Sequence, residues 1–119
     1  MKRAILLLTS ALLCGSALTA SGNHTVSQKG RKFSVATLHA KLGETIEFLN
    51  EDPFVHNIFS MSDTQSFDLG TFGKGEVRKI TLSKAGKIEV GCAIHPEMKL
   101  TIEVAGPAPA QPSPPHHAP

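Results

Sequence analysis

A thiol, an imidazole and a thioether lie within seven residues near the C-terminal end of the chain. Cys92, His95 and Met98 follow one another in the order Cys-x-x-His-x-x-Met. Thiolate, imidazole and thioether together are soft, polarisable donors that suit copper. A trigonal copper site holds one sulfur and two nitrogens near one plane, with a long and weak axial contact. The segment therefore supplies the sulfur, one nitrogen and an axial candidate, and it lacks a second nitrogen.

Two earlier histidines are candidates for the missing nitrogen. His56 follows the turn signal Asp52-Pro53-Phe54, and it opens a short strand-like segment. His39 lies in another strand-like segment that has no neighbouring donor residues. His56 is therefore the better candidate. We predict one copper ion per chain, bound by His56, Cys92, His95 and Met98.

The cysteine count agrees with a metal ligand. Of the two cysteines, Cys14 falls in a predicted export signal, so the exported chain keeps only Cys92. Exported proteins usually form disulfides, and an unpaired thiol there pairs between chains, lies inert in a core or binds a metal. A lone cysteine is most often a buried structural thiol. His95 and Met98 at their spacings favour the metal.

Both ends of the chain differ in composition from its middle. Residues 1–20 carry Lys2 and Arg3 before an apolar run and small residues, which predicts a secretory signal peptide. Residues 105–119 are mostly Ala and Pro and end near His116 and His117, which predicts an extended, disordered tail. One domain remains, over 21–104, and we expect it to be a periplasmic or secreted monomer.

Charge excludes some classes of partner. Without Lys2 and Arg3 the twelve Lys and Arg of the chain become ten, which balances ten Asp and Glu. No basic stripe predicts nucleic-acid binding, and the signal's apolar run is too short to span a bilayer. We therefore expect no nucleic acid and no membrane insertion. With no net charge, partner recognition is expected mainly through shape and apolar contact.

Short segments of alternating polar and apolar residues predict strands. They are Thr45–Phe48, Arg78–Leu82, Lys87–Val90 and Leu100–Val104, with further strands expected around 25–28, 37–42 and 55–60. No segment predicts a helix. Several short strands separated by Gly and Pro predict an all-β antiparallel sandwich or barrel. The aromatic residues Phe48, Phe54, Phe59, Phe67 and Phe72 are expected to pack in its core or loops.

The ligand order resembles that of the cupredoxins, the type 1 blue copper proteins. Cys-x-x-His-x-x-Met is similar to the short ligand loop of amicyanins, and His56-Asn57 is similar to the His-Asn of plastocyanin-like members. Gly43–Asn50 resembles their strand entry to the first ligand. The resemblance implies a cupredoxin-like antiparallel Greek-key β-sandwich. Its ligands would be imidazole from His56 and His95, thiolate from Cys92 and a weak axial Met98.

The resemblance also implies roles for neighbouring residues. Asn57 would tie the two ligand loops together and help to fix the cysteine sulfur. His95 would reach the surface within an apolar patch, for which Ile94, Pro96 and Phe54 are candidates. Glu97 departs from the apolar residue that many such loops carry, which leaves the docking surface open.

Two functions from different classes follow. The first is single-electron transport between redox partners, such as a periplasmic dehydrogenase and cytochrome c. The alternative is copper delivery or storage, which needs an open, exchangeable site rich in exposed Met or His. The compact ligand loop favours the electron carrier. We expect no enzyme, because no open coordination position or acid–base pair is apparent.

Overall fold

The computed structural model describes residues 22–107, which contain strands and no helix. The strands are β1 (Asn23–Gln28), β2 (Thr37–Lys41), β3 (Thr45–Asn50), β4 (His56–Met61), β5 (Ser66–Phe72), β6 (Val77–Thr81), β7 (Gly86–Cys92) and β8 (Lys99–Ala105). Among the described residues, none forms a helix with the length and apolarity that a bilayer crossing requires. The predicted signal and the histidines of the predicted tail lie outside this range, so both assignments stay predictions.

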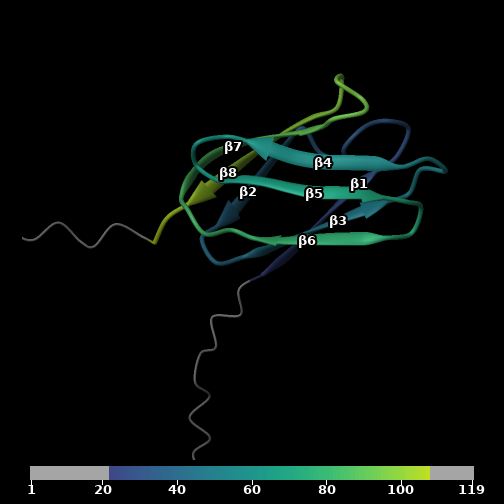
Figure 1. The fold of residues 1–119 in the computed structure, drawn as a ribbon. Coiled ribbons are helices and arrows are strands. Elements are labelled where there is room, and N and C mark those ends of the chain that lie inside the picture. Colours follow the sequence, from purple (N-terminus) through teal and green to yellow (C-terminus); the bar gives the residue numbers. More distant parts are fainter. Residues whose placement is uncertain (1–21, 108–119) are drawn as a thin grey trace, which may run out of the picture.

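The strands form two sheets that pack face to face (Figure 1). One sheet has the order β1-β3-β6, and the other has the order β2-β8-β7-β4-β5. The predicted all-β sandwich is confirmed. Within residues 22–107, four strand pairs are antiparallel, whereas β1–β3 and β2–β8 are parallel. Alternation fixes the face that each side chain occupies, but it leaves the direction of the neighbouring strand undetermined.

The core lies between the sheets and is filled by alternating side chains of both. Ile46 and Phe48 of β3 are fully buried, as are Leu100 and Ile102 of β8. Burial of one such side chain contributes about 1.5–3 kcal/mol of hydrophobic stabilisation. Cys92 belongs to the same buried cluster. The predicted metal site is therefore built on the packed core, not on a separate surface loop.

Strand β5 was not expected from the sequence. The pattern indicates only core or loop packing for Phe67 and Phe72, which here belong to a strand paired with β4. Gly70 inside this strand has a φ of +70°, and the β4–β5 register shifts between Asn57 and Phe59. Such an irregularity interrupts the two-residue period by which a strand is recognised. Phe72 pairs with His56 and is buried, so β5 supports the first predicted ligand.

Gly86→Ala is expected to destabilise the protein by about 1–3 kcal/mol. Gly86 opens β7 with a φ of +133°, and an added Cβ would lie 3.0 Å from Thr64 Oγ1. Gly106→Ala is the control, because Gly106 has no positive φ and its nearest neighbour would be Ala85 Cβ at 3.4 Å. Urea unfolding of both variants measures the difference. Equal midpoints would contradict backbone strain at Gly86.

Candidate metal centre

Three of the four predicted ligands meet where two neighbouring strands end. His56 is the first residue of β4, Cys92 is the last residue of β7, and His95 lies in the loop that leads to β8. Strands β4 and β7 are antiparallel neighbours, with Ile58 opposite Cys92. The ligand atoms of the three residues all lie within 4.8 Å of one another. Antiparallel pairing thus brings together residues that are 36 positions apart in the chain.

The cysteine sulfur lies between the two imidazole rings. Cys92 Sγ is 3.7 Å from His56 Nδ1 and 3.7 Å from His95 Nδ1. His56 is fully buried, Cys92 is buried and His95 is half-buried. Both rings therefore present the same nitrogen, Nδ1, to the space beside the sulfur. This arrangement offers a metal ion one sulfur and two nitrogens on a site closed to solvent on the His56 side.

Asn57 joins the two ligand-bearing segments through its main chain. Its N–H donates to Cys92 Sγ at 3.3 Å, and its carbonyl oxygen accepts the N–H of Ala93 at 3.0 Å. The expectation that this residue ties the loops together and fixes the sulfur agrees with these bonds. A hydrogen bond to sulfur also tunes the electron density that a thiolate gives a metal.

Met98 is placed by the turn of the ligand loop. Its N–H donates to the carbonyl oxygen of His95 at 3.0 Å, which closes the loop before β8 begins. The Met98 side chain is buried and belongs to the hydrophobic core. A buried thioether beside the loop fits the predicted fourth donor, and its ligation remains a proposal.

Asp52 is a functional candidate that the sequence analysis missed. Its Oδ2 lies 2.8 Å from His56 Nε2, and both side chains are buried. The same carboxylate accepts N–H bonds from Gly30 at 2.6 Å and from Arg31 at 3.1 Å. With Nε2 engaged by Asp52, Nδ1 of His56 is left to face Cys92. In the sequence, the one sign of this role is that an acidic residue lies four positions before His56. The backbone N–H groups that donate to Asp52 belong to a turn far earlier in the chain, which the sequence pattern does not reveal.

The environment of Asp52 favours its charged form. Burial opposes ionisation of this carboxyl, but the backbone N–H groups of Arg31 and Gly30 and the ring of His56 outweigh burial. Together they hold the pKa of Asp52 below its ordinary value. A carboxylate therefore stands behind His56, in the position from which outer residues commonly orient a metal-binding imidazole.

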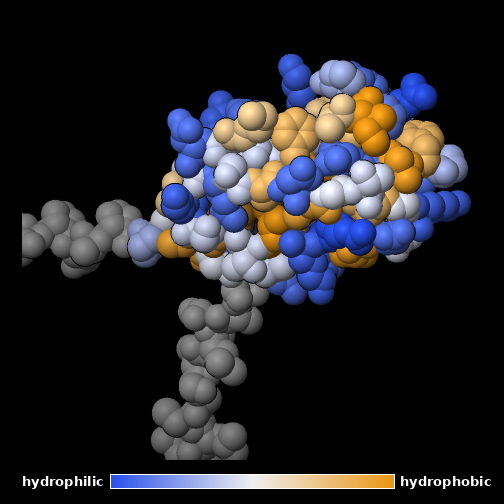
Figure 2. Space-filling view, viewed as in Figure 1, coloured by the Kyte–Doolittle hydropathy of each residue, from blue (hydrophilic) through white to orange (hydrophobic). Residues whose placement is uncertain are grey.

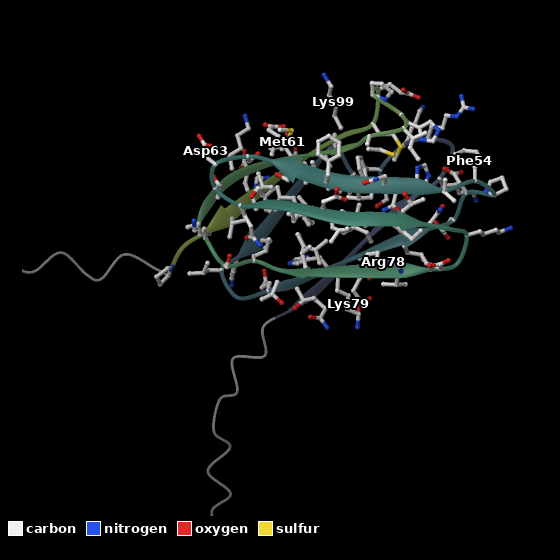
Figure 3. The ribbon with its side chains drawn as sticks, in the orientation of Figure 1. Phe54, Met61, Asp63, Arg78, Lys79 and Lys99 are labelled. Carbon is white, nitrogen blue, oxygen red and sulfur yellow. The ribbon has the colours of Figure 1, made fainter. Side chains whose placement is uncertain are left out.

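Aromatic and apolar side chains surround the exposed side of His95. The Phe54 ring lies 5.3 Å from the His95 ring and 5.4 Å from the His56 ring, measured between centroids. Ile94 is 48% exposed, Pro96 is exposed and Phe54 is half-buried. Figure 2 shows apolar side chains gathered at one end of the sandwich, and Figure 3 places Phe54 at that end. The three residues expected around His95 thus lie next to the site.

Two hollows border the ligand loop. One, of about 640 Å³, is lined by Phe59, Met61, Ala93 and Pro96 among others. The other, of about 200 Å³, lies toward the segment Arg31–Ala36 and is lined also by Glu97, Met98 and Lys99. The first is mainly apolar, whereas the second is lined by several charged side chains.

The other two histidines of the described residues, His24 and His39, lie apart from the centre. His39 is exposed on β2 and pairs with Glu103 at 3.2 Å. His24 on β1 pairs with Glu44 at 3.0 Å. Neither belongs to the donor cluster of His56, Cys92 and His95 found in residues 22–107. His116 and His117 fall outside the described residues.

The donor set fits copper. One buried thiol and two imidazoles converge within bonding reach of a common point, and a buried thioether lies in the same loop. This combination of soft sulfur and imidazole matches the trigonal His₂Cys sites with a weak axial methionine. Magnesium and calcium prefer oxygen ligands from carboxylates, carbonyls and water, whereas this cluster consists of two imidazoles and a thiol.

Comparison with known proteins identifies the family. Residues 20–105 match the model of the copper binding proteins of the plastocyanin/azurin family. The methylamine utilization protein MauL of Methylorubrum extorquens is 33% identical over 69 residues, which cover 57% of this chain and 60% of that protein. The chain thus spans about three fifths of this curated relative.

Solved structures share the fold. A reduced amicyanin mutant matches with a TM-score of 0.66 and 24% identity, covering 75% of this chain and 88% of amicyanin. A purple cupredoxin from Nitrosopumilus maritimus matches with a TM-score of 0.63 and 19% identity, over 69% of this chain and 99% of its own. The copper-containing nitrite reductase of Thermus scotoductus SA-01 matches with a TM-score of 0.67 and 32% identity. This match covers 71% of this chain but only 23% of the reductase. The predicted cupredoxin-like sandwich is confirmed.

Proposed function

The chain belongs to the plastocyanin/azurin family of copper-binding proteins, and we propose that it carries single electrons through one type 1 copper ion. We assign the ligands as His56 Nδ1, Cys92 Sγ, His95 Nδ1 and the Met98 thioether. The observation that carries the proposal is the position of Cys92 Sγ, buried and 3.7 Å from each of the two imidazole nitrogens. When bound, the copper ion supplies one-electron chemistry by alternating between Cu(I) and Cu(II).

The residues of the chain hold the site and limit its rearrangement. His56 is fixed by Asp52, and Cys92 Sγ is fixed by the N–H of Asn57. Met98 is buried in the same core cluster as Cys92. A site whose donors are held in place rearranges little when its charge changes, which favours fast electron transfer. His95, half-buried and flanked by exposed Ile94, gives the electron its route to the surface.

We propose redox proteins as partners, in the periplasm or outside the cell. A periplasmic dehydrogenase and cytochrome c are the expected donor and acceptor. The name of the relative MauL, a methylamine utilization protein, supports a partner that takes part in methylamine utilization. The expectations that the protein is a monomer and not an enzyme stay predictions.

Voltammetry and copper exchange together test the function against copper delivery. We expect the copper-loaded protein to give a reversible one-electron wave. It should also keep its copper during long incubation with a strong Cu(I) chelator, because His56, Cys92 and Met98 are buried. Rapid transfer of copper to the chelator, without a reversible wave, would refute the electron carrier and favour delivery.

Ile94→Lys is expected to slow electron self-exchange by about tenfold or more, because two copies must approach through the apolar surface around His95, where the two added lysines repel each other. NMR line broadening in mixtures of reduced and oxidised protein measures this rate. The visible spectrum should not change, because Ile94 is not a ligand. Leu42→Lys, in the turn between β2 and β3 at the far end of the sandwich, is the matched control; Leu42 is 40% exposed. Equal slowing in both variants would contradict a route through His95.

A further inference from the structure

We infer that the turn Lys29–Lys32 docks a carboxylate-rich surface of a redox partner beside the ligand loop. The inference rests on the proposed electron-carrier function and adds to it the chemistry of the partner's contact surface. The turn has the sequence Lys-Gly-Arg-Lys. It connects β1 to the segment that leads to β2, and it carries three cations in four residues.

The three cations of the turn are available to a partner. Lys29, Arg31 and Lys32 are exposed, and within residues 22–107 none of them makes an ion pair. Three cations elsewhere are neutralised by ion pairs. Arg78 pairs with Glu76, Lys79 with Glu47 and Lys87 with Glu89. The side chains of the turn therefore present positive charge that no ion pair among the described residues neutralises.

Backbone hydrogen bonds make the turn rigid. The N–H groups of Lys29 and Lys32 each donate to the other's carbonyl oxygen, at 3.0 and 3.2 Å. Asp52 accepts the next two N–H groups, those of Gly30 and Arg31. Arg31 takes a φ of +58°, the only positive φ of a non-glycine residue in the described chain. Such a conformation is unfavourable for arginine, and it is often retained where a side chain must be held in a functional position.

That position is next to the route of the electron. The Arg31 guanidinium lies 5.4 Å from the centroid of the Phe54 ring, which in turn lies 5.3 Å from the His95 ring. The smaller hollow lies between the turn and the ligand loop. Its lining includes three cations and one carboxylate, namely Arg31, Lys32, Lys99 and Glu97. A partner seated on these cations would have its surface next to Phe54 and His95.

Charge complementarity identifies the partner surface. The exported chain is formally neutral, so its attraction for a charged partner has to come from a local cluster. Charges act over about 10 Å at moderate salt, a range that covers the short distance from the turn to His95. Carboxylates of an acidic protein surface match lysine and arginine in charge and in hydrogen bonding. A membrane surface would also attract cations, and the experiment separates the two.

A carboxylate-terminated thiol monolayer on gold serves as the probe, and a hydroxyl-terminated monolayer serves as its neutral counterpart. Voltammetry of the copper-loaded protein, at low and then at high salt, measures the electron-transfer rate on each. At low salt we expect the rate on the carboxylate surface to fall about tenfold in Arg31→Gly and in Lys32→Glu. High salt should remove the difference. Arg31→Gly keeps the turn foldable, because glycine adopts positive φ without strain.

Lys84→Glu is the matched control, an exposed lysine in the turn between β6 and β7 at the opposite end of the sandwich. The docking proposal would be overturned if the unmodified protein and the three variants gave equal rates on the carboxylate surface. It would also be overturned if Lys84→Glu lowered the rate as much as the turn variants do. Either result would leave the electron-carrier function intact. Pelleting with phosphatidylglycerol vesicles that depends on Arg31, without a change at the electrode, would overturn it in favour of a membrane surface. No wave on the hydroxyl surface would overturn the electron carrier itself.

Discussion

Replacing Cys92 by serine is expected to abolish the intense blue absorption of the copper-loaded protein. That absorption is a charge transfer from thiolate sulfur to Cu(II), and Cys92 Sγ is the thiol sulfur that lies 3.7 Å from both His56 Nδ1 and His95 Nδ1. A serine hydroxyl is a hard, protonated donor and is a poor substitute for thiolate. Titration with Cu(II), followed by visible and electron paramagnetic resonance spectra, measures the loss. In the electron paramagnetic resonance spectrum we expect a narrow copper hyperfine splitting for the unmodified protein and a wider one for Cys92→Ser.

Folding of the Cys92→Ser variant should be nearly unchanged. The substitution nearly keeps the size of the side chain. Serine Oγ sits on a shorter bond than cysteine Sγ but still accepts hydrogen bonds, so weakening of the bond from Asn57 N–H costs at most about 1 kcal/mol. Met98→Leu is the comparison, because an axial thioether contributes weakly and its loss should shift the blue band without removing it. A blue band that survives in Cys92→Ser would refute the assigned site. If the unmodified protein binds copper but never shows the blue band, copper delivery or storage would be favoured over electron transport.

Replacing Asp52 by asparagine is expected to weaken Cu(II) binding by about 10–100-fold. The carboxylate accepts three bonds, from Gly30, Arg31 and His56. An asparagine has a single acceptor oxygen and turns an NH₂ group toward one of these donors. The ring of His56 then loses the partner that leaves Nδ1 facing Cys92. The reduction potential should rise too, because a negative charge near the ion favours Cu(II) over Cu(I).

Acid stability of the copper-free protein provides a second measurement on the same variant. The pKa of Asp52 is lowered in the folded state, so its stabilising contribution is present above the ordinary carboxyl pKa of about 3.9. That contribution is lost as the pH falls through the lower pKa of the folded protein. Asp52→Asn should therefore lose less of its free energy of unfolding than the unmodified protein does over that acid range. Competition with a chelator at neutral pH gives the change in copper affinity.

Asp68→Asn is the matched control for both measurements. Asp68 also accepts a backbone N–H bond, from Gly70 at 2.9 Å, but it is exposed on β5 and does not contact the donor cluster. Replacing Asp68 should leave the copper affinity, the reduction potential and the loss of unfolding free energy in acid unchanged. Equal losses of copper affinity in the two variants would contradict a specific role of Asp52 behind His56.

The amino-acid sequence by itself determined the local features of this protein. The alternation in Thr45–Phe48 and Leu100–Val104 fixed which residues are buried, because successive side chains of a strand point to opposite faces. The spacing of Cys92, His95 and Met98 defined one short loop, since a few residues leave little freedom of placement. His56 was inferred from the nitrogen that the loop lacks, together with the cupredoxin resemblance.

Only the tertiary structure decided the features that depend on residues distant in the chain. Strand β5 is recognised by its pairing with β4, because the irregularity at Gly70 removes the period that marks a strand. Asp52 is recognised by its contacts with His56 and with the turn at Gly30, 22 residues earlier. Arg31 reaches Phe54 through the same turn. Periodicity and turn chemistry act between near neighbours, whereas closure of the two sheets decides which distant side chains share a site.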